Sequence, residues 1–365
     1  MNLSKKDILI WLSHIGGVDH QVLSFMKNYF GSIEEIWTAE SKHIFHCLHN
    51  HSIIASRMMK NRNIEFYEKA IREIERSHIH VITELDTNYP EKLRHIYRPP
   101  FVLYQRGKLN MAKPGIAIVG ARKATPYGKW VAQKFAQELA AYHIGVISGL
   151  ALGVDTASHQ GALQKEGYTI AVLGCGLEQC YPASNQMLFN KIIESDGCIL
   201  SEYAPGTPPL KHHFPMRNRI ISALSDGVVI IEAGKRSGAM ITVECGIDQG
   251  KEIYAVPGNI NSGQSYGPNN LIQQGAKPLL EISNIIEDLE KIYRLESPQT
   301  AEQLERDLSE KEILVYKVIE ENPVSIDAVI NRTGIHISEL SALLTILEIK
   351  GFITQLSGNT FTVSK

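Results

Sequence analysis

The stretch Lys211-His-His-Phe-Pro-Met-Arg-Asn-Arg219 is followed by the apolar run Val228-Val-Ile-Ile231 and then by Gly234-Lys-Arg-Ser-Gly238. A run of valine and isoleucine without polar alternation predicts a strand that is covered on both faces. The segments on either side of it are basic, and they contain one aromatic residue, Phe214. Cations that can neutralise phosphates, beside a ring on which a base can stack, favour a single-stranded nucleic acid over a small free anion.

Similar apolar runs recur through the middle of the chain and alternate with stretches of helical periodicity. This alternation predicts a Rossmann-like α/β fold with a doubly wound, mostly parallel sheet. The predicted strands are Ile116–Val119, Ile144–Ile147, Thr169–Leu173, Cys198–Leu200, Val228–Ile231 and Glu252–Val256, and the clearest helices are Tyr127–Tyr142 and Asp155–Glu166.

Smaller modules are expected on both sides of this domain. Residues 1–80 show helical periodicity broken by glycine turns, which is typical of a helix-hairpin-helix or SAM-like domain. In the turn Gly16-Gly17-Val18-Asp19 a carboxylate stands where a DNA phosphate would approach, so packing or contact with a partner is the better interpretation. Residues 81–290 form the expected Rossmann-like domain, 291–308 a polar linker, and 309–365 a winged helix of three helices and a hairpin.

The C-terminal winged helix is expected to contact protein rather than DNA. Its predicted recognition helix, Ser338–Lys350, is chiefly apolar and acidic. Phosphates would repel such a helix, so it is a poor fit for a DNA groove.

The overall composition is that of an ordinary globular protein of 365 residues, with 37 Lys and Arg against 39 Asp and Glu and a net charge of −2. This balance argues weakly against a nucleic-acid-binding protein, but local clustering can still form a basic groove. The 5 cysteines form no CxxC pair and no metal-ligand spacing, and Gly174-Cys-Gly176 lacks the third glycine of a dinucleotide-binding turn. We therefore expect no metal, no cofactor and reduced thiols in a cytoplasmic protein. No apolar run reaches membrane-spanning length.

Glycine-rich turns follow the first two predicted strands. In a doubly wound sheet, ligands gather at the carboxyl ends of the strands. Arg122 offers a clamp for an anion there, and Asp155 is expected to cap the following helix. Asp155 and His159 can pair on one helix face, and we interpret the pair as structural because no nucleophile accompanies it. The residues expected to shape these loops are Gly120, Ser148, Gly149, Gly153 and Asp155.

The basic segment supplies most of the predicted DNA contacts. Lys211 and the two arginines can neutralise phosphates, and Phe214 can stack on a base. Arg217 and Arg219 cannot share one face of a helix, so one of them is expected to be structural. After the strand, Ser237 and Gly238 can form an anion nest at a helix start. The predicted DNA-binding residues are Arg122, Lys211, Phe214, Arg217, Asn218, Arg219, Ser237 and Gly238.

A set of motifs occurs in order across most of residues 81–280: Ile118–Arg122, Ser148–His159, Phe214–Arg219, Ser237–Thr242, Ala255–Gly258, Gly267–Ile272 and Gly275-Ala276. Together they resemble the DprA/Smf DNA-processing family. The resemblance implies a protein that binds and protects incoming single-stranded DNA in natural transformation and loads the RecA recombinase. It also implies a homodimer joined through the Rossmann-like domain, and a DNA pocket lined by Arg122, Lys211 and Phe214.

Two other classes of protein remain as alternatives. The first is a nucleotide phosphoribohydrolase of the lysine-decarboxylase-like group, because Ser237–Glu244 loosely matches the end of its phosphate-binding motif. The Pro-Gly-Gly start of that motif is replaced by Glu232-Ala-Gly234, so we expect a binding protein rather than an enzyme. The second is a structural adaptor around an inert core, which the cations at the strand ends make the weakest interpretation.

Overall fold

The protein is described from a computed structural model, in which residues 3–295, 308–321, 324–350, 352–356 and 360–363 are placed. Contacts divide the chain into two compact units, Met1–Glu296 and Ser297–Lys365. The boundary predicted near residue 80 falls inside the first unit, and most of the predicted linker 291–308 lies outside the described residues. Among the helices of the described ranges, none is long and apolar enough to cross a membrane.

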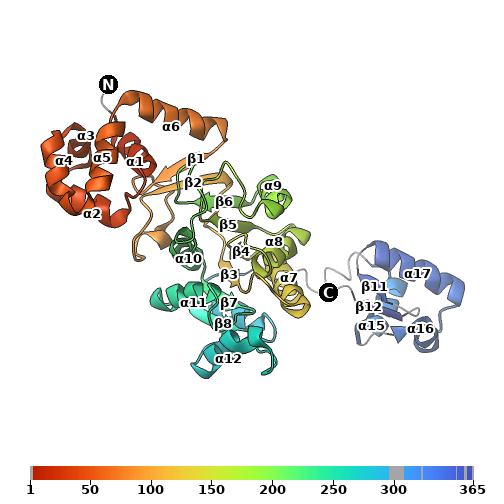
Figure 1. The fold of residues 1–365 in the computed structure, drawn as a ribbon. Helices are drawn as coiled ribbons and strands as arrows, with labels where there is room; N and C mark the ends of the chain where they lie inside the picture. The colour runs from red at the N-terminus through yellow and green to blue at the C-terminus, as the bar shows by residue number, and fades with distance from the viewer. Residues whose placement is uncertain (1–2, 296–307, 322–323, 351, 357–359, 364–365) are drawn as a thin grey trace. The chain divides into compact units, whose positions relative to one another are not determined.

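The first unit begins with a group of short helices, which Figure 1 draws in red and orange. The first of them is capped reciprocally: the Ser4 hydroxyl accepts from the amide of Asp7, and the Asp7 carboxylate accepts from the amide of Ser4. This capping box satisfies donors that a helix start otherwise leaves without a partner. The helices are α1 Lys5–His14, α2 His20–Phe30, α3 Ile33–Thr38, α4 Ser41–Cys47, α5 Ser52–Asn61 and α6 Ile64–Arg76.

The described residues of this unit also form a 9-stranded sheet in the order β1-β2-β6-β5-β4-β3-β7-β8-β9. From β6 to β9 all neighbours are parallel, whereas β2 pairs antiparallel with both β6 and β1. The bounds are β1 His80–Thr83, β2 Val102–Gly107, β3 Gly115–Val119, β4 Gly145–Ser148, β5 Thr169–Leu173, β6 Cys198–Ser201, β7 Gly227–Ile230, β8 Glu252–Ala255 and β9 Lys277–Pro278.

This topology confirms the doubly wound, mostly parallel α/β prediction, and it marks where a ligand is expected. The chain runs outward from β3 through β4, β5 and β6, and it then returns to place β7 on the other side of β3. The strand order therefore reverses between β3 and β7. A crevice opens at such a switch point, outside the carboxyl ends of the strands.

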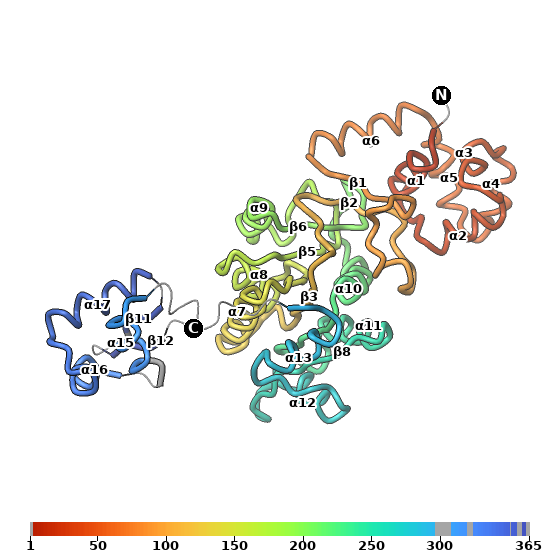
Figure 2. Tube along the Cα trace, turned by 180° about the vertical axis from the view of Figure 1, so that it is seen from behind, coloured from red at the N-terminus to blue at the C-terminus, as the bar shows by residue number. Residues whose placement is uncertain are grey.

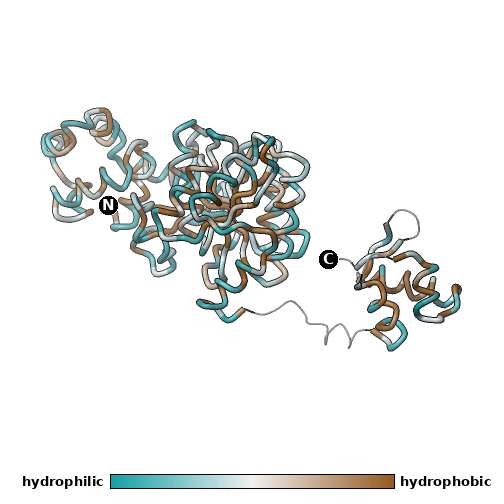
Figure 3. Tube along the Cα trace, turned by 90° about the horizontal axis from the view of Figure 1, so that it is seen from below, coloured by the Kyte–Doolittle hydropathy of each residue, from teal (hydrophilic) through white to brown (hydrophobic). Residues whose placement is uncertain are grey.

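Helices cover both faces of the sheet, so the strands are buried between two apolar layers. Figures 1 and 2 show α7, α8 and α9 on one face and α10 and α11 on the other. Apolar residues colour the interior of the unit brown in Figure 3. Successive strand residues pack into different layers: Ile118 and Val146 belong to the core on the first face, and Ala117 and Ile147 belong to the core on the second. The helices are α7 Pro126–Ala141, α8 Val154–Gln164, α9 Gln186–Glu194, α10 His213–Leu224, α11 Ala239–Asp248, α12 Tyr266–Gln273 and α13 Ser283–Glu290.

The N-terminal helices and the sheet share one apolar core. Trp11 and Leu12 of α1 belong to the same buried cluster as Phe101, Tyr104 of β2 and Phe189 of α9. The Trp11 side chain is fully buried, and its indole N–H donates to the carbonyl of Asn61 at 2.9 Å. The helical group is therefore joined to the antiparallel edge of the sheet by side-chain packing.

The second unit is a winged helix, as predicted. Its core contains Val315, Val329, Leu340, Leu344 and Phe361. The turn at Ser357–Asn359 lies outside the described residues. The elements are α15 Glu310–Glu321, β10 Val324–Ser325, α16 Ile326–Thr333, α17 Ile337–Ile349, β11 Ile353–Leu356 and β12 Thr360–Val363, with β12 between the other two strands.

One buried histidine ties α8 to the sheet and makes stability depend on pH. The Thr169 hydroxyl donates to the carbonyl of Val146, so it accepts from Nδ1 of His159 at 2.7 Å. Burial lowers the pKa of His159 to about 3. The expected Asp155–His159 pair is absent among the described contacts of both residues, because the His159 ring turns to Thr169 instead.

We predict that His159 destabilises the first unit as the pH falls below about 6.5. The unfolded chain binds a proton at His159 in that range, whereas the folded chain does not, so the free energy of unfolding decreases as the pH falls. Between about pH 7 and pH 5, protonation of His159 in the unfolded chain should lower the free energy of unfolding by roughly 2 kcal/mol. Denaturant unfolding of wild type and His159→Gln at both pH values measures it, with the pH dependence weaker in the variant. Equal pH dependence in the two proteins would contradict the assignment.

Candidate nucleic-acid interface

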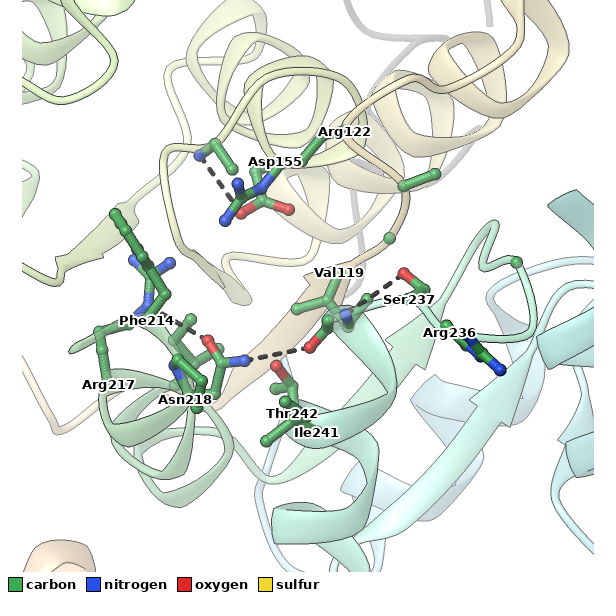
Figure 4. A pocket seen from close by; sticks show the side chains of 18 of the residues that line it. Val119, Arg122, Asp155, Phe214, Arg217, Asn218, Arg236, Ser237, Ile241 and Thr242 are labelled. Carbon is green, nitrogen blue, oxygen red and sulfur yellow. Dashed lines mark hydrogen bonds between the residues drawn. The ribbon is translucent and has the colours of Figure 1, made fainter. Parts of the chain in front are cut away.

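A cavity of about 930 Å³ opens at the carboxyl ends of β3 and β7, at the switch point of the sheet. Its walls come from the loop after β3, the loop after β4, the start of α10 and the loop after β7. Figure 4 shows Arg122 and Phe214 entering it from different elements, while Arg236 points away from its centre. Segments far apart in sequence, including both basic stretches around β7, therefore meet at one place.

Phe214 is the aromatic centre of this cavity. Its ring is half-buried; the Arg122 guanidinium lies 5.3 Å from the ring centroid, and the centroid of the Tyr181 ring lies 5.4 Å from it. A guanidinium over an aromatic face is attracted electrostatically by the ring. Arg122 and Tyr181 thus contact a ring that is still partly open to solvent.

The exposed cations of the cavity make no ion pair with a carboxylate in the described part of the chain. Among the residues that the structure describes, no ion pair is formed by Arg122, Lys123, Lys211, Lys235 or Arg236. Lys235 lies 5.7 Å from the ring centroid of Tyr266. Asp155 is the one carboxylate in the described lining. The positive charge here is therefore available to an anion from outside, which explains how a chain of net charge −2 can present a basic site.

Arg217 lines the cavity but serves the fold. Its side chain is 4% exposed, and its guanidinium donates to the carbonyls of Gly149, at 2.8 Å, and Val172. Asp155 binds the same loop: its carboxylate accepts from the amides of Gly149 and Ala151 at 3.1 and 3.3 Å. A Cβ on Gly149 would lie 2.6 Å from the guanidinium, so a larger residue there would have to displace Arg217.

Burial shifts the pKa values of both Arg217 and Asp155. Burial lowers the pKa of Arg217 to about 10 and raises that of Asp155, and the charge of each group opposes the shift of the other. Arg217 is therefore cationic at neutral pH. Asp155 is not the helix cap that the sequence suggested: α8 starts at Val154 with Gly153 as its N-cap, and Asp155 instead binds the loop before the helix.

Arg219 lies outside the described lining of the cavity. It is 6% exposed and makes a bidentate pair with Glu202 at 2.9 and 2.6 Å, and it also donates to the carbonyl of Arg98 at 3.1 and 2.8 Å. The sequence suggested that one arginine of the pair is structural. Both are, because Arg217 and Arg219 leave opposite sides of α10 and each finds backbone carbonyls inside the protein.

Asn218, Ser237 and Gly238 form the junction between α10 and the loop after β7. The Asn218 amide donates to the carbonyl of Gly238 at 3.3 Å, and the Ser237 hydroxyl accepts from the amide of Ala239 at 3.4 Å. Gly238 is the N-cap of α11 and is exposed to solvent. The amides of Ser237 and Met240 donate to carbonyls within this turn, so among its described contacts the Gly238 amide and the Ser237 hydroxyl are the donors left for an anion.

Close approaches fix the glycine turns. Gly153 has φ of +83°, and a Cβ there would lie 2.3 Å from the carbonyl oxygen of Ala121. A Cβ on Gly120 would lie 2.6 Å from Cγ2 of Val154. The Ser148 hydroxyl donates to the carbonyl of Ile118 at 2.7 Å and joins β4 to β3. The two loops are thus packed against each other.

Glu232 is a positioning residue that the sequence reasoning did not assign. It follows β7, is 5% exposed, and its carboxylate accepts from both the amide (2.8 Å) and the hydroxyl of Thr125, the N-cap of α7. This contact fixes the loop that carries Arg122. An acidic residue directly after an apolar strand, within a basic segment, was the available signal.

Comparisons with known proteins agree with this architecture. The family model of DNA recombination-mediator protein A matches residues 80–290, and the DprA winged helix domain model matches residues 299–359. Protein Smf of Escherichia coli (strain K12) is 34% identical over 333 residues, which are 88% of this chain and 88% of that protein.

Two solved structures are similar along much of their length. The X-ray structure of DNA processing protein A (DprA) from Streptococcus pneumoniae matches with a TM-score of 0.68 at 33% identity, over 79% of this chain and 98% of that one. DNA processing protein A from Helicobacter pylori matches with a TM-score of 0.54 at 34% identity, over 60% of this chain and 99% of that one. The latter structure is described as giving insight into a unique single-stranded DNA binding mode.

We predict that Gly128→Ala destabilises the first unit by about 1–3 kcal/mol, because a new Cβ would lie 2.4 Å from the carboxyl carbon of Glu232 and displace it from Thr125. Alanine otherwise favours a helix over glycine by about 1 kcal/mol, so a net loss isolates this contact. Denaturant unfolding measures it. Gly263→Ala is the control, since nothing lies within 4 Å of a Cβ at that position. A Gly128→Ala protein as stable as wild type would contradict the close contact.

Proposed function

The chain belongs to the DNA recombination-mediator protein A family, and from this premise we propose that it binds single-stranded DNA in the cavity at the carboxyl ends of β3 and β7. The observation that carries the proposal is the half-buried Phe214 ring among cations that have no described ion pair. Phosphates satisfy such cations, and an aromatic ring stacks on any base. A duplex does not present a free base face, so the ring favours a single strand.

The residues divide into contacting and supporting groups. Arg122 and Lys211 neutralise phosphates, and the Ser237 hydroxyl and the Gly238 amide offer donors to a further phosphate. Phe214 stacks on a base. Arg217, Asn218 and Arg219 act through the fold: they hold α10 and the loop after β7, so that the contacting groups face one another.

We further propose that bound DNA is protected and passed to the RecA recombinase in the cytoplasm, in natural transformation or recombination, by a homodimer joined through the Rossmann-like domain. The family description as a recombination mediator supports the first part. Large exposed aliphatic side chains in segments flanking β8 and β9, at Ile247, Ile260 and Leu280, support a contact between copies. Assembly of RecA on DNA coated by a single-strand-binding protein, and light scattering of the free protein, test these parts.

The lining of the cavity favours a binding role over the hydrolase alternative. Glu244, which would end the phosphoribohydrolase motif, is exposed on α11 and is not among the residues that line the cavity. The lining carboxylate, Asp155, is occupied by two backbone amides. Release of free base from a nucleoside monophosphate would instead support hydrolysis.

We predict that Phe214→Ala weakens binding of labelled oligothymidylate by roughly 5- to 150-fold, the loss expected for one base–aromatic stack. Arg122→Ala should also weaken binding, and it should lower the salt dependence by about one released counterion, since one phosphate contact disappears. Fluorescence anisotropy across a salt series measures both.

Two matched substitutions serve as controls for these variants. Phe45→Ala removes an exposed ring of α4, and Arg72→Ala removes an exposed guanidinium of α6. Both should bind as wild type. Retained affinity in Phe214→Ala and Arg122→Ala, with folding intact, would refute the proposed site.

A chain that ends at Glu296 should keep its affinity for short oligothymidylate within about threefold. The winged helix exposes Ile337, Ile346 and Ile349 on α17, and its Lys311 and Glu339 pair with each other, so this unit offers a partner apolar side chains rather than free cations. Anisotropy with the full chain and the truncated chain measures the difference. Loss of binding on truncation would show that the winged helix contacts DNA.

A further inference from the structure

Two large aromatic side chains are exposed on α7, beside the cavity. Tyr127 and Trp130 are 53% and 58% exposed, and their ring centroids lie 6.3 Å apart with the planes tilted by 32°. Of the 3 tryptophans in the chain, Trp11 is buried and Trp37 is half-buried. The buried side of α7, which includes Val131 and Phe135, already packs into the core. The two exposed rings therefore contribute little to the fold.

The surface around these rings is basic. Residues 121–137 contain Arg122, Lys123, Lys129 and Lys134, and no aspartate or glutamate. The Lys134 ammonium lies 5.4 Å from the Trp130 ring centroid. Its nitrogen also lies 3.6 Å from a carboxylate oxygen of Glu138, which is one helical turn further from the cavity. Aromatic rings interleaved with cations are the pattern of a track for single strands.

The rings also continue the cavity. Arg122 and Lys123 line it, and the chain then passes through Thr125 directly into the first turn of α7, where Tyr127 lies. The Glu232 carboxylate holds Thr125 and so fixes this helix start at the rim. Trp130 follows Tyr127 by about 5 Å along the helix axis. A strand that leaves the cavity past Lys123 therefore meets Tyr127 first and Trp130 next.

We propose that Tyr127 and Trp130 form a second stacking site, on which the bases of a single strand lie after it leaves the cavity. This inference rests on the proposed function. Charge supports this occupant over a second copy of the chain, because a symmetric contact would bring the same lysines of both copies together. The site is independent of base identity, since every base has a flat face to stack.

The test compares two lengths of oligothymidylate, about 5 nucleotides to occupy the cavity alone and about 20 to cover both sites. Trp130→Ala and Tyr127→Ala should each weaken binding of the long strand by roughly tenfold and leave the short strand unaffected. In the wild type, the long strand should quench tryptophan fluorescence and the short one should not. Trp130→Phe keeps a ring, so it should bind the long strand within about threefold of wild type yet lose the quench.

Tyr29→Ala, which removes an exposed ring of α2, is the matched control and should bind both strands as wild type. If the α7 variants bind the long strand normally while Phe214→Ala loses both strands, the second site is wrong and the proposed function stands. If Phe214→Ala binds both strands normally, the proposed function itself fails. Dissociation of a dimer in Trp130→Ala, with long-strand affinity unchanged, would assign the surface to a second copy and overturn the proposal.

Discussion

The buried guanidinium of Arg217 is the contact on which the site depends. A cation in the interior is tolerated only when backbone carbonyls and an opposite charge compensate it, and here Gly149, Val172 and Asp155 do so. These hydrogen bonds join α10 to the ends of β4 and β5. Phe214 lies one turn earlier on the same helix, so the position of its ring follows from the position of this charge.

The cations of this region fall into two groups with different environments. Arg217 and Arg219 are enclosed and hydrogen-bonded to the protein, whereas Arg122, Lys211 and Lys235 remain at the rim. The enclosed pair provides rigidity, and the rim provides charge. Sequence position alone does not separate them, because Lys211 of the rim and the enclosed Arg217 and Arg219 occur within one short basic stretch.

Much of the central fold was predictable, because β3 to β8 are apolar runs that need cover on both faces. The strands β1, β2 and β9 were not, since β2 contains Gln105 and Arg106 and lies between β6 and the edge strand β1, and β9 has only two residues. At the site, the spacing of Arg217 and Arg219 indicated that the two side chains leave different faces of α10. It did not indicate that both side chains are buried, because their burial depends on carbonyl groups of elements distant in the sequence. The sequence did not indicate the roles of Glu232 and Trp130 either, because each role depends on the position of the residue next to the loop that carries Arg122.

The antiparallel edge of the sheet has a consequence for synthesis on the ribosome. Strand β2 needs β6 as its neighbour, and the shared core of the N-terminal helices includes side chains as late as Phe189. β6 follows about 90 residues after β2, so at about 5–20 residues per second the early part of the chain waits several seconds for its partners. During that interval the first helices expose apolar surface, and completion of β6 is the step that lets this half of the protein close.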